Sequence, residues 1–122
     1  MQVNPQAMSK HTIFTVCLMT LLINSARAET VTVKYRGDVP LDTFECQNID
    51  RSSLVKRVCY DATQQYMVIS LNGTYYHYCE IGQGTVDSLL TAQSMGKYFN
   101  ANIKGSGSDG PFDCRTHRVP EY

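Results

Sequence analysis

The sequence lacks the residue spacings that mark the common metal, redox and phosphate sites. Its cysteines are far apart, so it has no close pair about two to four residues apart, as structural zinc sites use. It has no Cys-x-x-Cys redox pair. A Gly-x-Ser-x-Gly nucleophile turn and a glycine-rich phosphate loop are also missing. We therefore expect neither a metal ion nor another cofactor.

Two further absences concern charge and hydrophobic length. Of 11 basic residues, Lys10 and Arg27 come before position 29, which leaves 9 against 11 acidic residues and a net charge of about −2. Nucleic-acid-binding proteins usually carry a clustered basic surplus, so this balance argues against nucleic acid as the partner. The apolar run from Ile13 to Ile23 is shorter than the about 20 residues that a membrane-spanning helix needs.

The N-terminus has the three parts of a secretory signal peptide. Lys10 supplies a basic end, the apolar run follows, and Ala26-Arg27-Ala28 has small residues at the positions that signal peptidase reads. We expect cleavage after Ala28 and a protein of the periplasm or the exterior, and the sequence allows a start at Met1 or at Met8. The remaining 94 residues, 29–122, form one small domain whose core alone would give marginal stability.

Four cysteines remain after this cleavage. An even set of thiols in a short exported chain is typical of disulfides rather than of thiol chemistry. We therefore expect two disulfides that stabilise the small domain, formed by Cys46, Cys59, Cys79 and Cys114.

Alternating apolar residues predict an antiparallel meander of three strands. The strand-like runs are Ser53–Tyr60, Tyr66–Leu71 and Thr74–Cys79, and Asn72-Gly73 between the last two is a strong hairpin signal. Before the meander, Glu29 to Lys34 predicts a short strand with Val31, Val33 and Tyr35 on one side. We expect Gly37 to Pro40 to break this strand and residues 42–50 to form an extended arm.

Two helices are predicted after the meander. Thr85 can cap the first, whose apolar residues Val86, Leu89 and Leu90 have helical spacing. Ser94 can cap the second, and Gly105 is expected to end it. A flexible connector and a polar tail follow. The fold class is therefore α+β, a small meander with helices packed on one face.

Residues of the meander and of the second helix resemble the KTSC domain, a module found alone in bacterial proteins and at the C-terminus of some lysyl-tRNA synthetases. The resemblance rests on Ser52-Ser53, Val58-x-Tyr60-Asp61, Gly73 followed by Tyr76-x-Tyr78, Ala92-x-Ser94-x-Gly96-x-Tyr98-Phe99-Asn100, and Ile103. It implies a β-meander followed by helix, and RNA binding has been proposed for the synthetase-linked members. On this basis the chain divides into a signal peptide (1–28), an N-terminal extension (29–51), a KTSC-like domain (52–105) and a tail (106–122).

The chain departs from that family mainly in its cysteines. Cys59 and Cys79 lie in strands of the domain, and each extension adds one more cysteine. Ile81-Gly82 also replaces a Val-Pro that commonly follows the last strand in the family. Export would separate the chain from tRNA, so the RNA function of the family transfers poorly.

Strand alternation narrows the disulfide pairing. If Val58 and Tyr60 face the helices, Cys59 faces the opposite side of the sheet, together with Cys79. The first and third strands of a meander lie about 9–10 Å apart, too far for a Cys59–Cys79 bond. Cys59 and Cys79 should then each form a disulfide with a cysteine of an extension that crosses the outer face. We expect Cys46–Cys59 and Cys79–Cys114, and Cys46–Cys79 with Cys59–Cys114 remains the alternative.

The best candidate binding residues lie on the last strand of the meander. Aromatic side chains on a sheet can stack on bases or sugars or anchor a protein partner. The residues are Tyr75, Tyr76, His77 and Tyr78. Of these, Tyr76 and Tyr78, with Tyr60, are expected to pack in the core, so Tyr75 and His77 are the more open to a ligand.

The function we expect is non-catalytic binding to a partner in the cell envelope or outside the cell. One alternative is nucleic-acid binding through the sheet aromatics, as the resemblance implies. Another is a small hydrolase that uses His77 beside Glu80, for which the nucleophile would have to be a serine because the cysteines are oxidised.

Overall fold

The structure, a computed structural model, describes residues 29–105 and 110–122. The predicted signal peptide and most of the predicted connector lie outside the described residues. No described helix is long and apolar enough to cross a membrane.

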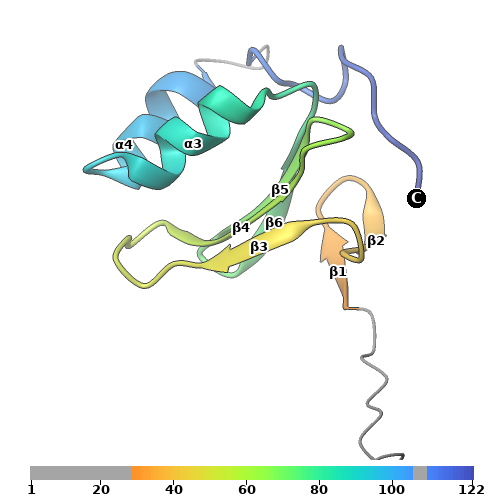
Figure 1. The fold of residues 1–122 in the computed structure, drawn as a ribbon, viewed down its shortest axis with the longest axis horizontal. Coiled ribbons are helices and arrows are strands. Elements are labelled where there is room, and N and C mark those ends of the chain that lie inside the picture. The colour runs from red at the N-terminus through yellow and green to blue at the C-terminus, as the bar shows by residue number, and fades with distance from the viewer. Residues whose placement is uncertain (1–28, 106–109) are drawn as a thin grey trace, which may run out of the picture.

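The described residues form an α+β fold built on one six-stranded sheet (Figure 1). The strand order is β2-β1-β6-β5-β4-β3. All neighbours pair antiparallel except β1 and β6, which are parallel and meet only at Val33 and Tyr75. The strands are β1 (Thr30–Val33), β2 (Gly37–Pro40), β3 (Glu45–Asn48), β4 (Val55–Asp61), β5 (Tyr66–Leu71) and β6 (Thr74–Tyr78).

The central meander β4-β5-β6 confirms the prediction from the sequence. Asn72 and Gly73 connect β5 to β6 with φ angles of 51° and 93°. Both angles are positive, as the twist of a two-residue hairpin requires, and few residues other than Asn and Gly adopt them readily. This turn sets the register in which Ile69 lies opposite Tyr76 and Val68 opposite His77.

Helices cover one face of the sheet, as predicted (Figure 1). Helix α3 (Gln83–Thr91) buries Val86 and Leu89. Helix α4 (Met95–Tyr98) continues into a π-helical segment, η2 (Phe99–Lys104), which buries Phe99 and Ile103. The inner core lies between these helices and Val58, Tyr60, Met67 and Ile69 of the sheet.

The predicted helix ends were right for the second helix and wrong for the first. Ser94 caps α4 by accepting a hydrogen bond from the Lys97 N–H, and Gly105, with φ of 73°, ends η2. Helix α3 begins two residues before Thr85, because the extended Gly82 serves as its N-cap without a side-chain hydrogen bond. The Gly82 carbonyl accepts from the N–H groups of Thr85 and Val86, so Thr85 already lies inside the helix.

The N-terminal extension covers the opposite face of the sheet. Val31, Val33, Val39 and Leu41 pack against Cys59, Tyr66 and Val68 to form a second core. The prediction that Gly37 to Pro40 breaks the first strand was wrong, because these residues form β2 and pair with β1. The chain reverses at Tyr35, whose φ of 71° makes a tight hairpin, and the Tyr35 side chain is 86% exposed rather than on the buried side with Val33.

The two disulfides are Cys46–Cys59 and Cys79–Cys114, which confirms the expected pairing. Residues 42–50 are not merely an extended arm, because they contain β3, which places Cys46 directly opposite Cys59 of β4. Cys79 follows β6 and binds the tail, and its N–H also donates to the carbonyl of Phe112. Strand β5 separates β4 from β6, which excludes a Cys59–Cys79 bond as argued from spacing.

Candidate functional site

The four predicted binding residues lie on β6 and point to alternate faces of the sheet. Tyr76 and Tyr78 are half-buried against the inner core, and the Tyr78 ring meets Phe99 edge-on with centroids 5.6 Å apart. Tyr75 packs against the outer core, and its hydroxyl accepts a hydrogen bond from Arg57 at 3.2 Å. Arg57 in turn forms an ion pair with Glu29 at 2.7 Å. Tyr75 is therefore held by the N-terminal extension.

His77 is held by a buried tyrosine on the neighbouring strand. Its Nδ1 lies 2.9 Å from the hydroxyl of Tyr66, and the two rings meet edge-on at 5.8 Å. Burial lowers the pKa of His77, and the Arg36 cation nearby lowers it further, against a smaller opposing effect of Asp113. The ring is therefore neutral at neutral pH.

The pair of His77 and Glu80 that the hydrolase alternative needs is not brought together among the described residues. The hydrogen bond of the His77 ring goes to Tyr66. The Glu80 carboxylate accepts from the backbone N–H of Arg118 at 2.8 Å. A histidine that acts as a general base in a triad is normally oriented by a carboxylate, and Tyr66 occupies that position here.

A groove of about 940 Å³ runs along the edge of β6. Strand β1 pairs with β6 only at Tyr75, so beyond this point the edge of β6 faces the groove. We call it the edge groove. Its walls come from the β1–β2 turn, from β6, from the end of η2 and from the tail. Its lining residues are Tyr35, Arg36, Tyr76, His77, Tyr78, Lys104, Gly110, Asp113, Cys114, Arg115 and Val119.

The edge groove combines aromatic rings with positive charge. Arg36, Lys104 and Arg115 line it, against the single carboxylate of Asp113. The Lys34 ammonium adds a further cation, 5.8 Å from the centre of the Tyr76 ring. Four of the 9 basic residues that follow position 28 thus gather at this one surface, although residues 29–122 together are slightly acidic.

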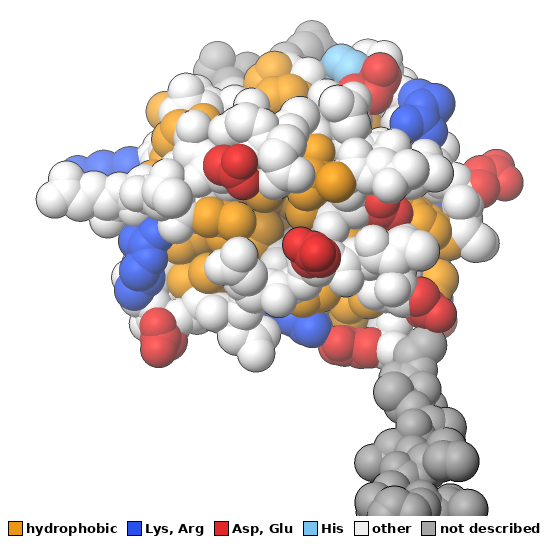
Figure 2. Space-filling model, viewed as in Figure 1, with side chains coloured by type: hydrophobic (Ala, Val, Ile, Leu, Met, Phe, Trp, Pro, Cys, Tyr) orange, Lys and Arg blue, Asp and Glu red, His pale blue; other side chains and the backbone are white. Residues whose placement is uncertain are grey.

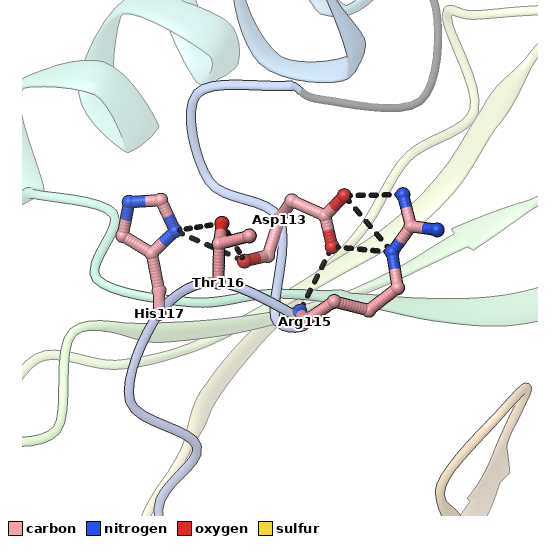
Figure 3. Close-up of polar contacts among 4 residues, drawn as sticks. All are labelled: Asp113, Arg115, Thr116 and His117. Atoms are coloured by element: carbon pink, nitrogen blue, oxygen red, sulfur yellow. Dashed lines mark hydrogen bonds and ion pairs between the residues drawn. The ribbon is translucent and has the colours of Figure 1, made fainter.

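The tail wall of the groove is a tight polar loop (Figure 3). The Asp113 carboxylate accepts from both the backbone N–H and the guanidinium of Arg115, with a shortest contact of 2.6 Å. These bonds lower the pKa of Asp113 to about 2. The backbone carbonyl of Asp113 lies 2.9 Å from Nδ1 of His117 and accepts from the hydroxyl of Thr116. This loop is placed next to β6 by the bond between Cys114 and Cys79.

Arg36 connects the groove to the outer core. Its guanidinium lies over the rings of Tyr66 and Tyr122, 5.1 and 5.6 Å from their centres, and its Nη2 donates to the carbonyl of Pro120 at 2.6 Å. The Arg36 side chain therefore fixes the end of the tail against the β1–β2 hairpin.

A second, smaller hollow of about 500 Å³ lies between α3 and the edge of β3 and β4. Figure 2 shows hydrophobic side chains gathered on this side of the molecule, with acidic side chains among them. Val58, Val86 and Leu90 supply the apolar surface, and Glu45, Asp61 and Asp87 supply the acids. Asp61 is buried, and its carboxylate accepts from Thr43 and Tyr122, so its role is to hold the tail and the arm in place.

One cluster of described residues has the geometry of metal ligands. Ligand atoms of His77, Cys79 and Cys114 all lie within 4.8 Å of one another. The two sulfur atoms are joined in a disulfide, and a metal ion binds the thiolate rather than the disulfide. While this bond is intact, the cluster is a cross-link beside a histidine and not a ligand set.

Sequence reasoning found three of the groove residues, Tyr76, His77 and Tyr78, but missed Tyr35, Arg36 and Lys104. The three that it found share one strand, where alternation and aromatic content are visible. Tyr35 was placed on the same side of the predicted strand as Val31 and Val33 because it continues their alternation. A signal was present in the Gly37 that follows, since a glycine there is compatible with a tight hairpin.

The fold and the groove together define a small, disulfide-linked α+β domain with one basic, aromatic surface. Residues 51–106 match the KTSC domain, so this part of the chain is similar to that family. The match spans the meander and both helices, and it leaves β1, β2, β3 and the tail outside. Comparison with curated protein sequences gives no match.

Proposed function

We propose that this protein is an exported, non-catalytic binding module and that its ligand binds in the edge groove. The two disulfides suggest an oxidising compartment, because such bonds are rare in the reducing cytosol. The N-terminal sequence pattern supports the same location.

One observation carries the proposal: the groove is built where both additions to the KTSC domain meet the domain itself. The β1–β2 turn supplies Tyr35 and Arg36, and the tail supplies Asp113, Cys114 and Arg115. Both additions are fixed to the sheet, the first by strand pairing and the second by the Cys79–Cys114 bond. Segments that only stabilised the core would not need to leave polar and aromatic side chains around an open groove.

A non-catalytic role fits the state of the titratable groups. His77 is neutral, is bound by Tyr66, and has no carboxylate hydrogen bond among the described residues. Asp113 is held ionised by Arg115. The Thr116 hydroxyl lies 3.1 Å from Nδ1 of His117, but it donates to the backbone carbonyl of Asp113. Rings beside cations suit the binding of a ligand.

The second candidate is single-stranded nucleic acid, which the cations and aromatic rings of the groove favour. It predicts an affinity that falls steeply with salt. The net charge of about −2 over residues 29–122 and the disulfides argue against it, so we place it second.

The experiment is a fragment-binding map on protein purified from the periplasm of cells that express the full chain. A library of small anionic, cationic and neutral compounds is added, and backbone amide shifts are followed by NMR spectroscopy. We expect shift changes to concentrate at residues 34–36, 76–79 and 110–115. Changes confined to the α3–β3 hollow, or no binding at all, would overturn the assignment of the site. The intact mass of the same sample reports whether residues 1–28 have been removed.

A further inference from the structure

Tyr35 occupies a backbone conformation that its own side chain does not favour. Its φ of 71° lies in the left-handed region, which glycine and asparagine adopt far more readily than tyrosine. The side chain is 86% exposed, so it contributes almost nothing to the core. A bulky aromatic residue at a strained and exposed turn lowers stability without a structural gain, and such positions point to binding.

Two lysine ammonium groups at the groove form no ion pair with the described residues. Lys34 and Lys104 are both exposed, and neither forms an ion pair with any residue that the structure describes. The Lys34 ammonium lies 5.3 Å from the centre of the Tyr35 ring and 5.8 Å from that of Tyr76. Lys104 reaches the groove from the end of η2. The other groove cations are engaged, since Arg36 binds the tail and Arg115 binds Asp113.

A groove that presents an exposed ring and two ammonium groups without ion pairs fits a ligand that alternates flat apolar faces with negative charges. A sugar ring presents C–H groups that pack on an aromatic face, and a carboxylate on that sugar can pair with an ammonium. A nucleic-acid strand carries a phosphate at every nucleotide and is usually followed by a longer track of cations. Only two lysines of this groove are without an ion pair among the described residues, which suits the few charges of a short acidic saccharide better than a chain of phosphates.

We propose that the edge groove binds an acidic saccharide, with Tyr35 stacked on a sugar ring and Lys34 and Lys104 paired with its carboxylates. This inference rests on the proposed function, and it adds the class of ligand and the residues that contact it. Tyr35 is the specificity residue of the site, and its strained backbone conformation lowers the stability of the fold.

The test measures the binding of tetragalacturonate and tetramannuronate to the full-chain protein purified from the periplasm. The matched ligand control is fully methyl-esterified tetragalacturonate, which keeps the rings and removes the charges. A tetrathymidylate strand tests whether the groove binds single-stranded nucleic acid instead of a saccharide. We expect at least one acidic tetrasaccharide to bind, and its methyl ester and the oligonucleotide to bind about tenfold more weakly or not at all.

Three variants separate binding from folding. Tyr35→Asn relieves the left-handed strain, so we expect an equal or higher thermal midpoint together with about tenfold weaker saccharide binding. Lys104→Gln should weaken binding about threefold to fivefold, as expected for one exposed ion pair. Lys97→Gln, an exposed lysine of α4 outside the groove lining, is the matched control and should bind like the wild type.

Failure of this inference can be told apart from failure of the proposed function. Equal binding of the methyl ester, tighter binding of the oligonucleotide, unchanged binding by Tyr35→Asn, or no binding of either saccharide would overturn the saccharide assignment. If fragments still bind at the edge groove, the proposed function survives such a result. If fragments bind elsewhere or not at all, both are overturned.

Discussion

Cys46 and Cys59 lie directly opposite each other on the paired strands β3 and β4, with their Cα atoms 4.0 Å apart. The bond therefore links the edge strand β3, which belongs to the N-terminal extension, to its neighbour β4. The bond between Cys79 and Cys114 links the tail to the end of β6, and the two residues are 35 positions apart in the sequence. The tail reaches the groove from its disulfide, whereas the β1–β2 turn reaches it through the pairing of β1 with β6.

The two disulfides should contribute differently to stability and to binding. Replacing Cys46 and Cys59 by alanine should lower the free energy of unfolding by about 3 kcal/mol, and replacing Cys79 and Cys114 should lower it by about 4 kcal/mol, because the second closes the longer loop. Urea unfolding measures both values. We expect fragment binding in the groove to be lost only in the second variant, which releases the tail. Binding that persists there would show that the tail wall is not needed.

The hydrogen bond between Tyr66 and His77 should stabilise the outer core. Tyr66→Phe removes the hydroxyl that lies 2.9 Å from the His77 ring, and we expect a loss of about 1 kcal/mol in the free energy of unfolding. Tyr98→Phe is the matched control, because the Tyr98 hydroxyl forms no hydrogen bond with the described residues and its loss should change little. Equal effects of the two substitutions would contradict the assigned role of the Tyr66 hydroxyl.

Stability should fall when the pH is lowered through the range in which His77 protonates in the unfolded chain. Burial and Arg36 lower the pKa of His77 in the folded protein, so the unfolded state takes up a proton first as the pH drops below 6.5. The folded protein therefore loses stability between pH 6.5 and the lower folded pKa, and the loss then levels off. His77→Gln should remove this part of the pH profile, measured by urea unfolding at a series of pH values. A profile that His77→Gln leaves unchanged would show that the ring does not contribute.

Asp113 should also lower stability as the pH falls, but in a more acidic range than His77. Arg115 lowers its pKa from 3.8 to about 2, so its ionised form stabilises the fold above pH 3.8 and this contribution disappears as the pH falls toward 2. Asp113→Asn should cost less than about 1 kcal/mol at neutral pH, because the Arg115 guanidinium is largely exposed and the pair is screened. The difference between wild type and variant should vanish near pH 2. Asp42→Asn, an exposed acid without a hydrogen bond to the described residues, serves as the control.

Local signals explain which parts of the fold could be predicted from the sequence. Asn72-Gly73 and the strand alternation gave the meander, Ser94 and Gly105 gave the ends of the second helix, and the strand faces gave the disulfide pairing. These features depend on neighbours in the chain or on the spacing of three adjacent strands. The π-helical segment at Phe99 and the glycine cap of α3 were missed, because tertiary packing rather than a capping side chain decides them.

The groove itself could be predicted only in part. Its β6 residues follow from a pattern within one strand, whereas Tyr35, Lys104 and Asp113 come from three segments that are far apart in the sequence. The parallel contact between Val33 and Tyr75 brings the first segment to β6, and no short-range pattern encodes a pairing of that kind. The left-handed backbone conformation of Tyr35 could not be predicted either, because the alternating pattern alone favours a strand that continues through this residue.

The most direct test of an exported module with covalently anchored extensions is a non-reducing peptide mass map of protein recovered from the periplasm. We expect a chain of residues 29–122 without free thiols, in which Cys46 is linked to Cys59 and Cys79 to Cys114. An uncleaved chain with four free thiols at these positions would contradict the account, and cytosolic RNA binding would then become the function to test.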